Sequence, residues 1–73
     1  MKVDPILTIQ TERETDGRWL ADIAELPGVM CHGVSWEEAV AKAEALALRV
    51  LADRVEHGED VPELSIFFSC MNE

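Results

Sequence analysis

The sequence predicts an α+β fold of element order β-β-β-α-β, an antiparallel sheet of three to four strands with one long helix packed on one face. Two segments near the N-terminus alternate apolar and polar residues and are joined by an Asp-Gly pair, which is a hairpin signal. A helix-capping motif then opens an alanine-rich stretch, and a short apolar segment follows. Because 73 residues allow only one small core, we expect a single domain over residues 1–73.

The first two strands should form a hairpin. The first is expected over residues 5–14, where apolar side chains alternate with polar ones. Asp16 and Gly17 then supply the pair whose positive φ angles suit a tight turn. The second strand is expected over residues 19–24 and runs antiparallel to the first, with Trp19 and every second residue after it on one face.

A break in the sheet ladder is expected at Pro27 and Gly28. Proline brings no backbone N–H donor, and glycine accepts φ angles that are closed to other residues. A bulge or turn should therefore separate the second strand from a short third strand over residues 29–34.

The helix should begin after Ser35, which is well placed as an N-cap, and Glu38 completes a reciprocal capping box with it. The helix is expected over residues 36–57 and should end where Gly58 can take a left-handed conformation. A last strand is expected over residues 64–69, which are rich in large apolar side chains.

The predicted helix is apolar over more of its circumference than one sheet requires. A second stripe of small residues suggests that another helix or chain packs there, although an exposed face chosen for helix propensity explains it nearly as well. The sheet face opposite the helix is expected to carry some of Leu20, Met30 and Phe67, and a homodimer or a different protein would cover it. The stripe assigned to the sheet is Trp36, Ala39, Val40, Ala43, Ala47, Val50 and Leu51, and the second stripe is Ala41, Ala45, Leu48 and Ala52.

The charge balance is strongly acidic, with fifteen acidic and six basic residues and a net charge of -9. Binding to nucleic acid requires clustered Lys and Arg, so we expect no direct contact with DNA or RNA. No apolar run approaches the roughly 18 to 20 residues that span a bilayer, and the N-terminus lacks the apolar stretch of a signal peptide. We therefore expect a cytoplasmic protein without a membrane segment.

No nucleophile constellation, phosphate loop or metal-ligand cluster stands out, so we expect no enzymatic activity, no cofactor and no metal. Asp22 and Glu25 are the acids that most resemble metal ligands, but their spacing puts them on opposite faces of a strand unless a bulge intervenes. Cys31 and Cys70 are expected to be reduced and mostly buried, because neither has a partner at metal or dithiol spacing.

A set of residues spread over 5–68 carries a family likeness: Asp16-Gly17, Trp19, Ala21, Glu25-Leu-Pro-Gly28, Gly33, Glu37-Glu38-Ala39, Glu56, Gly58-Glu59 and Pro62. With these residues in this order, the chain resembles the HicB antitoxin family, small proteins that bind and silence a HicA messenger-RNA-cleaving toxin. The resemblance implies a trimmed ribonuclease H-like fold that keeps the scaffold without the chemistry. It also implies a basic toxin as partner. The homodimer or higher homo-oligomer is expected from the uncovered apolar faces of the helix and the sheet. Many members carry a further DNA-binding domain, which we do not expect after Phe68.

The predicted contacts with such a toxin combine charged and aromatic residues. An RNA-binding nuclease presents a basic surface, to which an acidic protein can be steered. Trp19 can equally be a core residue, and the acidic helix end can equally be a solvated charge run. The residues predicted to bind the partner are Trp19, Asp22, Glu25, Glu56, Glu59, Asp60 and Glu63.

Two other classes of function stay open. The first is a stand-alone oligomeric binding module, without enzymatic activity, for another basic protein or a small ligand. The second, ranked well below it, is a metal-dependent nuclease with a reduced set of acids, which would cleave RNA in the presence of magnesium.

Overall fold

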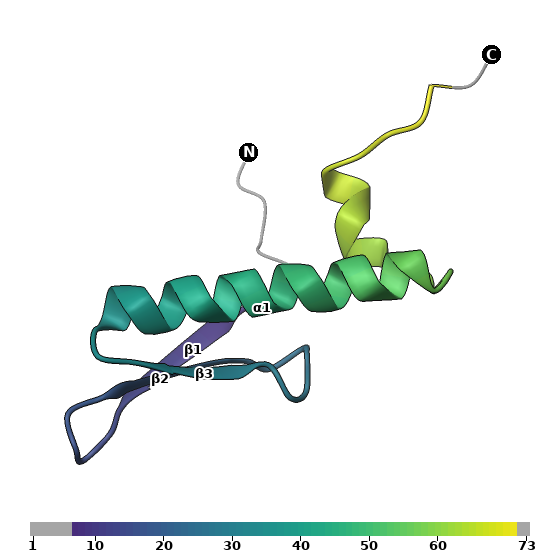
Figure 1. The fold of residues 1–73 in the computed structure, drawn as a ribbon. Coiled ribbons are helices and arrows are strands. Elements are labelled where there is room, and N and C mark those ends of the chain that lie inside the picture. Colours follow the sequence, from purple (N-terminus) through teal and green to yellow (C-terminus); the bar gives the residue numbers. More distant parts are fainter. Residues whose placement is uncertain (1–6, 72–73) are drawn as a thin grey trace.

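The computed structural model describes residues 7–71 and confirms the α+β fold in its coarser form (Figure 1). Three antiparallel strands form a sheet of order β1-β2-β3, and one long helix packs on one face of it. A 3-10 helix follows after the long helix. The elements are β1 (Ile9–Arg13), β2 (Trp19–Ile23), β3 (Met30–Gly33), α1 (Trp36–Glu56) and η1 (Pro62–Ile66).

The β1–β2 hairpin closes through a three-residue loop with glycine last. The N–H of Gly17 donates to the carbonyl of Glu14 at 2.9 Å, and the N–H of Glu14 donates to the carbonyl of Arg18 at 2.8 Å. Gly17 has a φ of 89°, whereas no described residue other than glycine has a positive φ. The expectation of positive φ angles at both Asp16 and Gly17 was therefore wrong for Asp16. A loop of three residues needs a left-handed conformation only at its last position.

The link between β2 and β3 contains two consecutive turns. The N–H of Leu26 donates to the carbonyl of Ile23, and the N–H of Val29 donates to the carbonyl of Leu26, both at 3.1 Å. In the second turn Pro27 precedes Gly28, whose φ is 92°. This is the residue pair that a type II turn requires, because its third position has a positive φ. The turns bring Leu26 and Val29 into the core.

Both ends of α1 are capped. At the start, Ser35 Oγ accepts from the N–H of Glu38 at 3.1 Å, and Glu38 Oε1 accepts from the N–H of Val34 at 3.0 Å. A capping box would use the N–H of the N-cap residue Ser35, whereas the second bond uses the N–H of Val34, one residue earlier. At the other end Gly58 has a φ of 78°, and the N–H of Glu59 donates to the carbonyl of Arg54 at 2.9 Å. This last bond is the 6→1 bond of a Schellman motif.

The core lies between the sheet and one stripe of α1. The helix covers β2 and β3 more fully than β1. Trp36, expected in this stripe, is instead 46% exposed. It is the first residue of α1, and its Nε1 donates to Thr11 Oγ1 of β1 at 3.3 Å. The buried core residues are Ala21, Ile23, Leu26, Val29, Ala39, Ala43, Ala47 and Leu51.

The sheet face opposite the helix is mostly polar. By the alternation of the strands it carries Leu20 and Met30 from the expected apolar set, of which Leu20 is half-buried and Met30 is 55% exposed. Phe67 is not on this face, because it follows η1. The other side chains of the face are Gln10, Glu12, Asp22 and His32.

The last strand, expected over residues 64–69, is not formed in the structure. The chain forms η1 and then continues without regular structure to Met71. Pro62 fixes its own φ and favours the first turn of a helix. Local bonds then use the carbonyl groups that a strand would offer to a neighbour: Leu64 N–H donates to Val61 at 3.1 Å, and Phe67 N–H to Leu64 at 2.9 Å.

Candidate partner-binding groove

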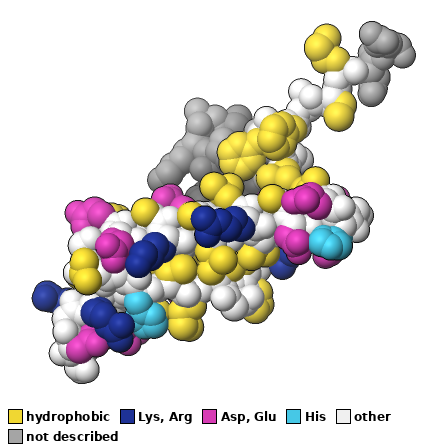
Figure 2. Space-filling view, in the orientation of Figure 1, with side chains coloured by type: hydrophobic (Ala, Val, Ile, Leu, Met, Phe, Trp, Pro, Cys, Tyr) yellow, Lys and Arg dark blue, Asp and Glu magenta, His cyan; other side chains and the backbone are white. Residues whose placement is uncertain are grey.

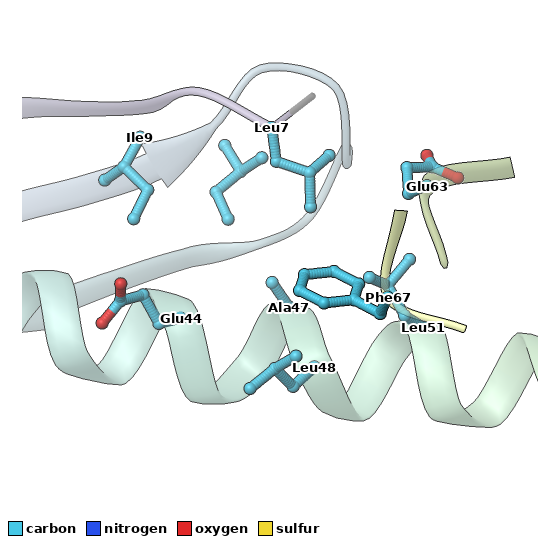
Figure 3. Close-up of a pocket in the computed structure, with 9 residues that line it drawn as sticks. Leu7, Ile9, Glu44, Ala47, Leu48, Leu51, Glu63 and Phe67 are labelled. Atoms are coloured by element: carbon cyan, nitrogen blue, oxygen red, sulfur yellow. The ribbon is translucent and has the colours of Figure 1, made fainter. Parts of the chain in front are cut away.

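An apolar groove runs between the sheet, α1 and η1, and we call it the α1–η1 groove. It consists of a cavity of about 500 Å³ (Figure 3) and a second one of about 330 Å³. The two cavities share Leu48 and Leu51. Its walls combine Leu7, Ile9 and Ile23 from the sheet side, Glu44, Ala47, Leu48, Leu51, Ala52, Val55 and Glu56 from α1, and Glu63, Leu64, Phe67 and Phe68 from η1 and the residues after it.

The groove exposes large apolar side chains to water. Leu48 is 62% exposed, Phe67 is 68% exposed and Phe68 is 72% exposed. Burial of apolar surface is favourable by roughly 25 cal/mol per Å², so a partner that covered these side chains would gain binding free energy. Because these exposed apolar side chains line one groove, the groove is the candidate protein-interaction site among residues 7–71.

The polar residues that line the groove are all glutamates. Glu44 and Glu63 line the larger cavity and Glu56 lines the smaller one. Among residues 7–71 none of the three forms an ion pair. Figure 2 shows acidic side chains beside apolar ones at the C-terminal end of α1. The groove therefore combines an apolar floor with three glutamates that pair with no cation of residues 7–71.

Trp19 and Asp22, two of the predicted contact residues, do not share a surface with the groove. Trp19 lies on the helix-facing side of β2, half-buried against the cluster of Ala21, Ala39 and Ala43. The Cζ of Arg13 is 5.9 Å from its ring centroid, a cation–π distance. Asp22 lies on the opposite face of the sheet, because alternate residues of a strand point to opposite sides.

Glu25 has a structural contact. Its Oε1 accepts a hydrogen bond from the N–H of Thr8 at 2.9 Å. That hydrogen bond, which favours the ionised form, is the main reason why the pKa of Glu25 lies below its ordinary value. The side chain thereby ties the residues before β1 to the turn after β2.

The acids at the helix end fall into two groups. Glu56 and Glu63 line the groove, while Glu59 and Asp60 are exposed in the connection between α1 and η1. Negative charge at this end opposes the helix macrodipole, which favours cations there. The four acids thus share one end of the molecule, and two of them share a surface with the apolar floor.

Sequence reasoning missed the groove itself. Leu48 belonged to the second helix stripe, but Leu7, Ile9 and Glu44 were not predicted to lie near a site. The signal that could have found them was the combination of that stripe with the alternation of the first strand. The sequence does not specify the space between the helix and the edge of the sheet at this point.

The described part of the chain gives no support for a metal site or a membrane span. Residues 7–71 contain no cluster of three or more His, Cys, Asp or Glu arranged to hold a metal ion. Cys31 is half-buried and Cys70 is exposed, so the expectation of burial was wrong for Cys70. Within the same residues no helix is both long and apolar enough to span a bilayer.

No family model, curated protein or solved structure matches this chain.

Proposed function

We propose that this chain is a HicB-like antitoxin, which binds and neutralises a HicA-type messenger-RNA-cleaving toxin by protein–protein contact. The observation that carries the proposal is the α1–η1 groove, an apolar surface whose polar lining residues are all glutamates. The residues that resemble the HicB family support it from the side of the sequence, among them Asp16-Gly17 and Glu25-Leu-Pro-Gly28.

A surface of this kind suits a toxin that binds RNA. Such a toxin needs clustered Lys and Arg to hold phosphates, so its working surface is basic. Complementary charge raises the rate of association, and apolar contacts supply most of the affinity. In the groove the three glutamates provide the charge, and Leu48 and Phe67 provide exposed apolar area. The toxin would be blocked because its RNA-binding surface is occupied.

The finer fold assignment belongs to the same proposal. A trimmed ribonuclease H-like scaffold is supported by the order of three antiparallel strands and one long helix. The C-terminal 3-10 helix departs from the predicted order, in which a strand follows the helix. We also propose that the chain acts in the cytoplasm, without catalysis and without a cofactor.

The test is neutralisation in cells, with one groove variant and one matched control. Leu48→Asp places a charge on the apolar floor, and we expect it to weaken binding to a HicA-type toxin by about tenfold or more. Met30→Asp is the control, because Met30 is similarly exposed but lies on the opposite sheet face. Co-expression of each variant with the toxin should restore growth only for the wild type and the control. Equal rescue by both variants would remove the groove from the proposal.

A stand-alone oligomeric module is the second candidate, and one observation favours it. The radius of gyration is 14.7 Å, whereas a compact domain of this length has about 11 Å. Phe68 and Met71 are 72% and 95% exposed on a segment that leaves the body of the molecule (Figure 1). Both candidates allow a homo-oligomer, so a binding titration with a basic toxin decides between them. A defined homo-oligomer in light scattering with no affinity for the toxin would favour the module.

A further inference from the structure

Among residues 7–71, strand β1 has no neighbour on its outer edge, which lies beside the groove. It is the outer strand of the sheet, and within residues 7–71 it pairs on one side only, with β2. The backbone of Glu14 points toward β2, because its N–H donates to Arg18. Backbone groups alternate in direction along an antiparallel strand, so those of Ile9, Thr11 and Arg13 point outward. These groups can pair with a further strand.

The larger cavity of the groove lies along this free edge. Ile9 from β1 and Leu7 just before it form one side, and Ala47 and Leu51 from α1 form the floor (Figure 3). Helix α1 leaves this edge of the sheet less covered than β2 and β3. An extended segment placed beside β1 would point every second side chain onto the apolar floor of α1.

Charge limits what that segment can be. Glu44 and Glu63 are the polar residues of the larger cavity and lie toward its two ends in Figure 3. Covering either carboxylate without a cation would remove it from water at a cost in free energy. An occupant with Lys or Arg near both ends avoids that cost and adds two ion pairs.

We propose that an extended segment of the partner, with alternating apolar side chains and a Lys or Arg at each end, adds to the outer edge of β1 as a fourth strand. This inference rests on the proposed function and specifies how the partner binds. Main-chain hydrogen bonds to β1 give affinity, and the groove selects the side chains. The C-terminal residues of this chain fit less well, because residues 64–71 contain neither Lys nor Arg.

A synthetic peptide tests the geometry without a known partner. The probe is a capped peptide of alternating valine and threonine with a lysine at each end, and the reference peptide carries glutamate at both ends. Hydrogen exchange of the labelled protein is followed by NMR. With the lysine peptide at about ten times its Kd, the amides of Ile9, Thr11 and Arg13 should exchange about tenfold more slowly. The glutamate peptide should leave them unchanged.

Paired variants test the charge requirement. Glu44→Gln combined with Glu63→Gln should weaken binding of the lysine peptide about fivefold, as expected for the loss of two partly exposed ion pairs. Glu12→Gln combined with Glu37→Gln removes the same charge away from the groove and should leave the affinity unchanged. An equal loss in both pairs of variants would reduce the effect to net charge and would overturn the proposed pairing.

Several other results of these experiments would refute strand addition at β1. The proposal fails if the lysine peptide does not bind, if it binds without slowing the three amides, or if those amides are already slow in the free protein. Slow amides in the free protein would mean that this chain or a second copy occupies the edge. A HicA-type toxin that binds without slowing the amides would refute strand addition and leave the antitoxin function standing. Peptide addition at β1 with no toxin binding would support strand addition and refute the antitoxin function.

Discussion

Glycine serves two different purposes in this chain. Gly17, Gly28 and Gly58 have positive φ angles, and a Cβ on any of them would meet no heavy atom within 4 Å. At Gly33 the φ angle is not the reason. A Cβ there would lie 2.5 Å from the backbone nitrogen of Ala39 and 3.0 Å from its Cα. The absence of a side chain at Gly33 therefore sets how closely β3 approaches the first turn of α1.

Alanine substitutions should separate the two purposes. Gly33→Ala should lower the free energy of unfolding by about 3 kcal/mol, because the new methyl group would overlap backbone atoms, which cannot rotate away. Gly58→Ala should cost only about 1 kcal/mol, since the residue has space and suffers only from its left-handed φ. Urea denaturation of both variants measures the difference. Equal costs would show that β3 and α1 can move apart without penalty.

The ionisation of Glu38 at the start of α1 makes the free energy of unfolding depend on pH. Its pKa lies below the ordinary value of 4.5, first because its carboxylate accepts from the N–H of Val34 and then because Lys42 is close, at 3.4 Å. A group whose pKa is lowered on folding stabilises the fold above its unfolded pKa. That contribution is lost as the pH falls through the folded value. Asp16 and Glu25 have lowered pKa values for similar reasons and act in the same direction.

The unfolding free energy should therefore decrease as the pH falls below about 4.5. Glu38→Gln keeps the shape of the side chain and removes the titrating group, so its stability should fall less steeply over this range. The measurement is urea denaturation at a series of pH values. Glu37→Gln is the matched control, because Glu37 is the neighbouring acid in the same helical turn. Identical slopes for the wild type and Glu38→Gln would contradict the role given to the cap.

Leu51 and Leu48 of α1 differ in burial, and this difference separates a core role from an interface role. Leu51 is 4% exposed and belongs to the core, while Leu48 is 62% exposed, yet both line the groove. Leu51→Ala should lower the free energy of unfolding by about 2–5 kcal/mol. Leu48→Ala should change it by less than about 0.5 kcal/mol and still weaken partner binding. Thermal denaturation and a binding titration on both variants check this. A large loss of stability in Leu48→Ala would place that residue in the core and not in an interface.

The elements of the fold could be predicted where the signal is local. The hairpin depends on Gly17, and the helix start depends on Ser35 and Glu38, whose contacts are close in sequence. The prediction of a last strand was wrong, because a strand needs a neighbour to pair with and the apolar run does not specify one. In the structure Pro62 and local hydrogen bonds produce a 3-10 helix in its place.

The candidate site was predictable only in part for the same reason. Local sequence indicates where acids gather, and Glu56 and Glu63 do border the groove. Whether Trp19 faces the core or the solvent depends on the register and on the side of the sheet that α1 covers. The alternation places Trp19 and Asp22 on opposite faces of the sheet, and neither residue lines the groove.

The small core, the extended shape and the acidic charge of the molecule all agree with the proposed binding of a partner. A compact chain of 73 residues has little core, and here the fully buried side chains are few and include four alanines. The radius of gyration of 14.7 Å exceeds the roughly 11 Å of a compact domain because the C-terminal segment projects. A net charge of -9 raises the rate of association with cationic proteins. These features agree with the proposed contact between this chain and an oppositely charged partner.

Charge reversal at the helix end tests this at the same scale. Replacing Glu59, Asp60 and Glu63 by lysine should weaken binding to a basic toxin by about tenfold or more, because attraction becomes repulsion beside the groove. The slope of log Kd against log salt should also decrease, since fewer opposite charges meet. Lysine at Glu12, Asp22 and Glu37 changes the net charge equally at positions away from the groove. If long-range attraction alone mattered, both triple variants would lose the same affinity. A larger loss in the helix-end variant would locate recognition at the α1–η1 groove.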